Sequence, residues 1–193
     1  MGERWIVVGL GNPGAQYGRT RHNVGQMVLD ELARRTGGMF AVSSKTRTHL
    51  IQTRLRPGGP PVALVKPMSY MNLSGGPVLN VMKFFGQDEQ RLIVVHDELD
   101  IDFDTIKLKR GGGEGGHNGL RDITKACGSK DYVRVRVGVG RPPGRMDTAD
   151  FVLKPFTHQE QQALPSLLDR AADAVEQIID DGLTAAQNTI HAR

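Results

Sequence analysis

The amino-terminal segment constrains the fold more than any other part of the chain. The apolar run from Trp5 to Leu10 is long enough for a buried strand, and it stops at a turn, Asn12-Pro13-Gly14. Apolar residues then recur at helical spacing from Val24 to Leu32. A strand, a polar loop and a helix form the repeating unit of open α/β sheets, whose ligands bind beyond the carboxyl ends of the strands. We therefore expect functional side chains between residues 12 and 23.

The rest of the chain predicts more strands and helices around the same sheet. Helices are expected at about 23–36, from Ser74 to Phe85, at about 120–126 and from about residue 157 onward; strands are expected at 49–55, 62–65, 91–95, 106–109 and 133–137. Asn23 paired with Gln26, and Ser74 alone, are candidate helix caps. We expect one domain over residues 1–193, a three-layer α/β sandwich with a mixed, mostly parallel twisted sheet and helices on both faces.

Composition excludes several classes of protein. No run of about 18 apolar residues is present, and the first apolar run is too short for a signal peptide, so we expect a cytoplasmic protein with no membrane association. The single cysteine, Cys127, excludes an internal disulfide framework and a cysteine-based zinc site.

Charge is distributed unevenly along the chain. Residues 105–145 hold 10 basic and 3 acidic side chains, whereas residues 146–193 hold 3 basic and 8 acidic ones. The two strands in the basic segment alternate charged and apolar residues, which predicts one cationic face on each. Such a face fits a polyanion such as nucleic acid, and the alternative is an ordinary solvated surface. We expect the acidic carboxyl-terminal helices to close one side of the binding groove.

Two other kinds of site match the sequence poorly. Gly9-Leu-Gly-Asn-Pro-Gly14 fits the G-x-G-x-x-G pattern of dinucleotide sites, but Pro13 removes a backbone N–H that would bind pyrophosphate. The acidic residues about 20 positions later, Asp30 and Glu31, lie in a helical pattern and do not end a second strand. A calcium loop that begins at Asp100 would need glycine at its sixth position and glutamate at its twelfth, but Thr105 and Gly111 occupy them.

A hydrolytic site is the better interpretation. If the strands at 5–10 and 91–95 are neighbours, Asp97 at the end of the second strand faces His22. A carboxylate on one imidazole nitrogen fixes the tautomer and leaves the other nitrogen to accept a proton from water. Asn12, Asn72 and Asn118 begin or end elements at the same sheet edge, where amides suit holding a carbonyl and stabilising an oxyanion.

Several motifs occur together in one order along the chain. They are Gly9-Leu-Gly-Asn-Pro-Gly14 with Tyr17, Thr20-Arg-His-Asn23, Met71-Asn-Leu-Ser-Gly75, His96-Asp-Glu-Leu-Asp100 and Gly115-Gly-His-Asn-Gly119. With these motifs the chain closely resembles the bacterial-type peptidyl-tRNA hydrolases over nearly its whole length. The resemblance implies cleavage of the ester between a peptide and the 3′ ribose of tRNA, which frees tRNA from stalled or aborted translation.

The resemblance also implies roles for individual residues. It makes His22 the catalytic base, Asp97 its orienting carboxylate and Asn12 a group that holds the scissile carbonyl. Substrate contacts are implied for Tyr17, Asn23, Tyr70, Met71, Asn72, His117 and Asn118, and a clamp for the tRNA 5′ phosphate is implied for Lys107, Lys109 and Arg136. The family implies no metal, no organic cofactor and no obligate protein partner, so we expect a monomer that binds peptidyl-tRNA. The alternative is a tRNA-binding module without catalytic activity.

Overall fold

A seven-stranded mixed sheet forms the centre of the molecule. In a computed structural model, which describes residues 3–191, the strand order is β2-β3-β4-β1-β5-β7-β6. The central strands β4, β1, β5 and β7 are parallel, and five of the seven strands run in one direction, because only β3 and β6 are reversed. The strands are β1 (Trp5–Gly9), β2 (Ala41–Ser43), β3 (Thr48–Thr53), β4 (Val62–Pro67), β5 (Leu92–Glu98), β6 (Ile106–Arg110) and β7 (Val133–Gly138).

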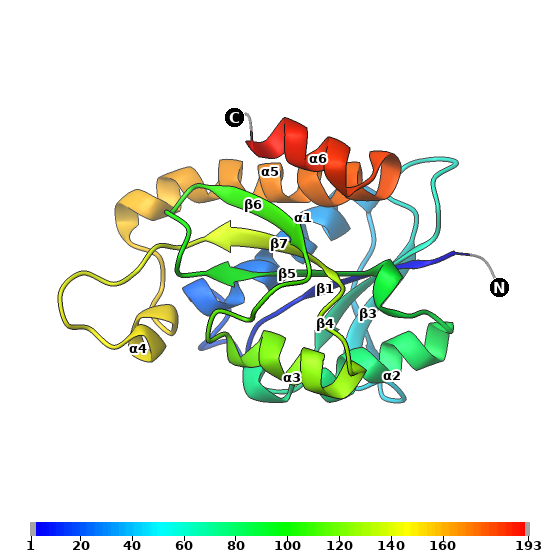
Figure 1. Cartoon of the computed structure of the whole chain (residues 1–193), viewed down its shortest axis with the longest axis horizontal. Coiled ribbons are helices and arrows are strands. Elements are labelled where there is room, and N and C mark those ends of the chain that lie inside the picture. The colour runs from blue at the N-terminus through cyan, green and yellow to red at the C-terminus, as the bar shows by residue number, and fades with distance from the viewer. Residues whose placement is uncertain (1–2, 192–193) are drawn as a thin grey trace.

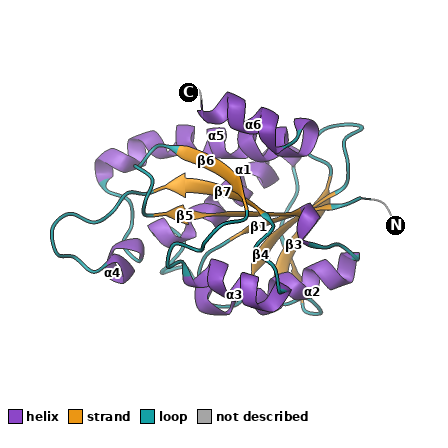
Figure 2. Ribbon diagram, viewed as in Figure 1, coloured by secondary structure: helices purple, strands orange, loops and turns teal. Residues whose placement is uncertain are grey.

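Helices cover both faces of the sheet, as the sequence predicts (Figure 1, Figure 2). One face packs against α1 (Val24–Thr36) and α5 (His158–Asp181), with α6 (Leu183–His191) beside β6. The other face packs against α2 (Gly75–Phe85) and α3 (Asn118–Cys127). Alternate residues of β1 enter the two cores, since Val7 faces α1 while Ile6 and Val8 face α2. The three-layer α/β architecture is therefore confirmed.

Short elements complete the chain. They are the 3₁₀ turns η1 (Arg21–Asn23), η2 (Met71–Leu73) and η3 (Glu89–Arg91), together with the five-residue helix α4 (Thr148–Val152). No helix in residues 3–191 has the length and apolar character needed to cross a membrane.

Strands β1 and β5 lie side by side, which confirms the neighbouring expected from their apolar runs. They pair in parallel with Gly9 opposite Val95, and the Leu10 N–H continues the pairing by donating to the Val95 carbonyl at 3.1 Å. The loop after β1 and the residues that end β5 consequently meet at one edge of the sheet.

Two glycines let α1 begin directly on this part of the sheet. A Cβ atom on Gly25 would lie 2.2 Å from the Val95 carbonyl oxygen, and one on Gly9 would lie 2.5 Å from the Gly25 carbonyl oxygen. Real Cβ atoms do not approach so closely, so backbone packs against backbone with no intervening side chain. This contact fixes the turn η1, immediately before α1, over the end of β5.

The two predicted side-chain caps are wrong. Asn23 precedes α1 without capping it, because its side chain is hydrogen-bonded to the backbone of Asn12. Ser74 makes no capping bond to α2 either, since its hydroxyl donates to the Met71 carbonyl at 2.6 Å. Both side chains instead brace the loops at the carboxyl edge of the sheet.

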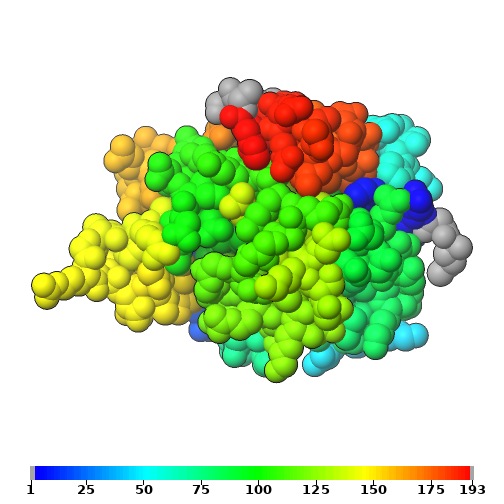
Figure 3. Space-filling model, in the orientation of Figure 1, coloured from blue at the N-terminus to red at the C-terminus, as the bar shows by residue number. Residues whose placement is uncertain are grey.

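The acidic carboxyl-terminal helices do not line the cavity beside His22 and Asp97, where they were expected to close one side of the groove. Helix α6 packs on β6, where Gln187 and His191 hydrogen-bond the Leu108 backbone at 3.0 Å each, and acids of α5 surround Arg35 of α1. The segment that carries α4 closes the groove instead, and it forms the yellow lobe that projects from the left of the molecule in Figure 3. The apolar stripe of α5 explains the difference, because it is buried against the sheet.

Candidate active site

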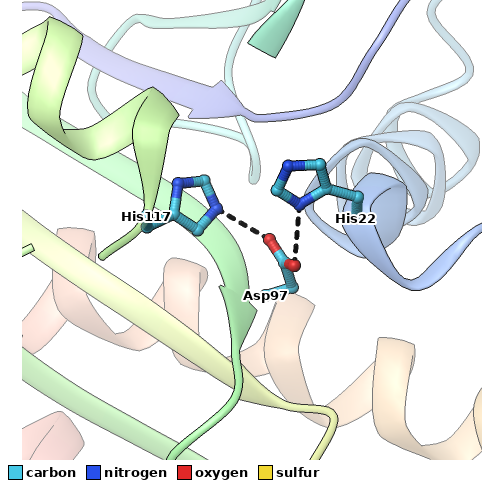
Figure 4. Close-up of side chains that lie close together, drawn as sticks. All are labelled: His22, Asp97 and His117. Atoms are coloured by element: carbon cyan, nitrogen blue, oxygen red, sulfur yellow. Dashed lines mark hydrogen bonds and ion pairs between the residues drawn. The ribbon is translucent and has the colours of Figure 1, made fainter. Parts of the chain in front are cut away.

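Asp97 lies at the carboxyl end of β5, between two imidazole rings (Figure 4). Its Oδ2 is 2.8 Å from Nδ1 of His22, and its Oδ1 is 2.8 Å from Nε2 of His117. Asp97 is buried, with 3% of its surface exposed. The structure thus brings His22 and Asp97 into contact, as the neighbouring strands require, and adds His117 from the start of α3.

The hydrogen bonds define the tautomer of each histidine. His117 caps α3, because its Nδ1 accepts from the backbone N–H groups of Gly119 and Leu120 at 3.1 and 3.3 Å. Its hydrogen therefore resides on Nε2, which donates to Asp97. An ionised carboxylate only accepts, so His22 donates from Nδ1, and the lone pair on its Nε2 has no partner within residues 3–191. Asp97 therefore holds the His22 ring in one orientation, with Nε2 as the basic atom.

Charge and burial shift the pKa values in this cluster. Burial lowers the pKa of His22, but the charge of Asp97 and the hydrogen bond to it outweigh this effect, and the pKa is raised above 6.5. Burial also opposes ionisation of Asp97, but the two imidazoles outweigh it and hold the pKa of Asp97 well below its ordinary value. The carboxylate stays ionised, and His22 binds a proton more readily than a free imidazole does.

The side-chain amide of Asn12 is hydrogen-bonded through its oxygen, which leaves its NH₂ group available. Its Oδ1 accepts from the Met71 backbone N–H at 2.7 Å, and its backbone N–H and C=O bond to the Asn23 side chain at 2.9 and 3.0 Å. The amide nitrogen of Asn12 has no partner among the described residues and is available to a ligand. The structure therefore places Asn23 behind Asn12 as its support.

A cavity of about 340 Å³ opens in front of these groups. It is lined by predicted site residues from four separate segments of the chain: Asn12, His22, Met71, Asn72, Asp97, His117 and Asn118. Three other predicted substrate contacts, Tyr17, Asn23 and Tyr70, do not line this cavity. The rings of Tyr17 and Tyr70 pack edge to face with centroids 6.4 Å apart.

The three predicted clamp residues lie on β6 and β7, along the sheet from the cavity. Lys107 pairs in register with Arg136, and Lys109 with Arg134. Burial, followed by the charges of Arg136 and Arg134, lowers the pKa of Lys109, which shows that these cations crowd one another. Arg134, expected to present its charge to solvent, is instead fully buried and donates to the carbonyls of Gly112 and Gly113. These two bonds anchor the glycine loop to β7.

The cluster offers ligand atoms that a metal ion would accept. His22, Asp97 and His117 each present one such atom, all within 4.8 Å of one another. Both imidazole nitrogens in this set already donate a hydrogen to Asp97, so a metal would have to displace two protons. The hydrogen-bonded arrangement therefore favours acid–base chemistry at His22.

Sequence reasoning missed two features of the histidines. The bond from His117 to Asp97 was not foreseen, although the position of His117 just before a helix indicates a cap. His96, given no role, is buried and donates from Nδ1 to the Asp97 carbonyl at 2.7 Å, with its ring edge-on to His117. Burial lowers the pKa of His96 to about 3, so it remains neutral.

Comparisons with known proteins find the same family over nearly the whole chain. A family model described as peptidyl-tRNA hydrolase matches residues 6–193. The peptidyl-tRNA hydrolase of Arthrobacter sp. (strain FB24) is 64% identical over 191 residues, which cover 99% of this chain and 98% of the relative. That of Paenarthrobacter aurescens (strain TC1) is 62% identical with the same coverage. The crystal structure of peptidyl-tRNA hydrolase from Acinetobacter baumannii is similar with a TM-score of 0.91 at 35% identity, over 100% of this chain and 96% of that one.

Proposed function

The chain belongs to the peptidyl-tRNA hydrolase family and is a carboxylic ester hydrolase, and we propose that His22, Asp97 and Asn12 carry out its chemistry. The substrate is peptidyl-tRNA, and the bond cleaved is the ester between the peptide and the 3′ ribose. The observation that carries the catalytic assignment is the free Nε2 of His22, because the opposite nitrogen of the ring is fixed by Asp97 at 2.8 Å. Within this family, a tRNA-binding module without turnover is not favoured.

The reaction begins with a water molecule beside Nε2 of His22. The imidazole takes a proton from the water as its oxygen attacks the ester carbonyl, and Asp97 stabilises the imidazolium that forms. The tetrahedral intermediate then breaks its bond to the 3′ oxygen, which receives the proton from His22. The products are a peptide with a free carboxyl group and a tRNA with a free 3′ hydroxyl.

Asn12 suits the stabilisation of the developing oxyanion. Its Oδ1 is held by the Met71 N–H, so its amide N–H groups remain in a fixed direction and need no reorganisation during the reaction. Asn72 and Asn118 line the same cavity and are proposed to bind the peptide and the attacking water.

The tRNA is proposed to extend along the sheet toward β6 and β7. Lys107, Lys109 and Arg136 there form a cationic surface suited to the 5′ phosphate. We also propose that the enzyme acts as a monomer in the cytoplasm, as a single domain over residues 1–193, and that it needs no metal or organic cofactor.

Release of tRNA from N-acetyl-aminoacyl-tRNA tests this proposal. The purified protein is expected to release tRNA with excess chelator present, and His22→Ala is expected to lower kcat by about 10²–10⁴-fold while tRNA binding persists. Loss of release in chelator, restored by a divalent metal, would contradict the acid–base mechanism. Equal turnover by His22→Ala would contradict the assignment of the base.

A further inference from the structure

A second cavity adjoins the active site at Asn12. It has a volume of about 280 Å³ and lies between the 12–18 loop, the start of α1 and the edge formed by β3 and β4. Asn12 lines both this cavity and the one that holds His22. A peptide that extends past Asn12 from the catalytic residues is therefore expected to reach the second cavity. The volume is just below the ~300–1,000 Å³ of small-molecule pockets, which suits one side chain and its backbone.

The strand order indicates which part of the substrate reaches this cavity, provided that the proposed function holds. The phosphate clamp lies on β6 and β7, the catalytic residues follow β1 and β5, and the second cavity lies at β4 and β3. Neighbouring strands are about 4.8 Å apart, so along the strand order the catalytic residues lie between the clamp and the second cavity. The tRNA and the peptide leave the ester in opposite directions. With the tRNA assigned to β6 and β7, the peptide is directed toward β4 and β3.

The polar side chains that line the second cavity are a lysine, a histidine and three amides. Lys66 of β4 and His49 of β3 are register partners, so their side chains lie on the same face of the sheet, toward α1. The Lys66 ammonium lies 4.5 Å from the centroid of the Phe40 ring, and Gln26 adds an amide from α1. Among the described residues that line the cavity, none carries a carboxylate.

Lys66 retains capacity for a second anion. Its side chain is 17% exposed and it is paired with Asp30 of α1, whose side chain is 62% exposed. An ammonium has three donors, and the bond to Asp30 occupies one of them. We propose that this cavity binds the peptide residue adjacent to the esterified one and favours an acidic side chain there, with Lys66 as its charge partner.

The experiment compares substrates that differ only in that residue. One tRNA carries N-acetyl-Asp-Ala, N-acetyl-Ala-Ala or N-acetyl-Lys-Ala, and kcat/KM is measured for each. The wild-type enzyme is expected to favour the Asp substrate over the Ala substrate by about two- to five-fold, the range of a partly exposed ion pair, and to favour it less in high salt. The Lys substrate is expected to be the slowest.

Two variants of the ion pair should act in opposite directions. Lys66→Gln is expected to remove the preference for Asp, whereas Asp30→Asn is expected to increase it, because the ammonium then has no competing carboxylate. Lys83→Gln is the matched control, since Lys83 is an exposed lysine of α2 on the other face of the sheet, and it should keep the wild-type ratio.

A wild-type ratio of one between the Asp and Ala substrates would overturn the proposal. So would variants of Lys66 and Asp30 that shift the ratio in the same direction, because that result indicates a structural ion pair. N-acetyl-Ala-tRNA, which has no second residue, is measured in parallel. Its release tests the hydrolase mechanism alone, so failure of the second cavity and failure of the catalytic assignment give different results.

Discussion

Replacing Asp97 by asparagine tests the core of the proposed mechanism. The change keeps the shape of the side chain but removes its charge, and the new amide has only one oxygen to offer two imidazole N–H donors. Its NH₂ group would face the hydrogen of one ring, so that ring must change tautomer or turn away. If His22 changes, its cavity-facing nitrogen carries a hydrogen and no longer acts as a base.

The size of the effect follows from these bonds. A hydrogen bond to a charged group contributes about 1.5–3 kcal/mol and a neutral one about 0.5–1.5 kcal/mol, so each of the two bonds is weakened. Loss of the base tautomer adds to this, and a general base contributes about 10²–10⁴-fold. We expect kcat to fall by that factor, or about 3–5 kcal/mol in activation free energy.

The pH profile supplies an independent measurement. Neutral His22 is the active form and its pKa is raised above 6.5, so wild-type kcat/KM should increase with pH through a midpoint above 6.5. In Asp97→Asn both effects that raise this pKa are lost while burial remains, so the midpoint should move to lower pH. The assay is release of tRNA from N-acetyl-aminoacyl-tRNA, with thermal unfolding to verify that the variant is folded.

The matched control is Asp100→Asn. Asp100 follows the same strand but is exposed and paired with Arg141 at 2.7 Å, so the change should leave kcat and its pH midpoint as in the wild type. Retention of more than a tenth of wild-type kcat by Asp97→Asn, or an unmoved midpoint, would refute the role given to this carboxylate.

Three further predictions concern groups around the site. Lys107→Ala or Arg136→Ala should weaken tRNA binding and reduce the slope of log K against log salt by about one, and an unchanged slope in a binding titration would remove that residue from the clamp. Gly25→Ala should lower the free energy of unfolding by about 1–3 kcal/mol in a denaturant titration and also reduce kcat, because the new Cβ meets the backbone of Val95. A variant with wild-type stability would contradict that contact. Arg21→Met should lower the free energy of unfolding by about 3 kcal/mol, because Arg21 is buried beside the catalytic histidine and pairs with Glu160 at 2.9 Å. A change below about 0.5 kcal/mol, the size of an ordinary surface effect, would show that this pair contributes little.

The sequence predicted the parts of the site that follow from the order of the elements. Apolar runs identified β1 and β5 as buried strands, and their pairing brings His22 to Asp97. Contacts that depend on the path of a loop were not predictable in this way. His117 reaches Asp97 because a glycine-rich loop turns back across β7, and Arg134 is buried because that loop covers it. Alternation along a strand shows which residues share a face, but it does not show whether a loop lies above that face.

The caps failed for a related reason. Asparagine and serine before a helix fit a cap on local grounds, and nothing nearby in the sequence shows that a distant backbone needs the same side chain. Asn23 bonds to Asn12 across 11 residues, and this second use of the side chain is visible only after α1 is placed against β1.

The contact between Gly9 and Gly25 limits how far α1 can shift on the sheet, so the core under α1 tolerates fewer changes in packing than the core under α2. Side chains between two elements absorb a small change in spacing by adopting other rotamers, but two backbones in contact have no such freedom. A substitution at Leu29 of α1 is therefore expected to move the turn that carries His22, whereas one at Val81 of α2 acts on a helix that packs on the sheet through side chains. Random mutagenesis should consequently recover active enzymes with altered packing under α2 far more often than under α1.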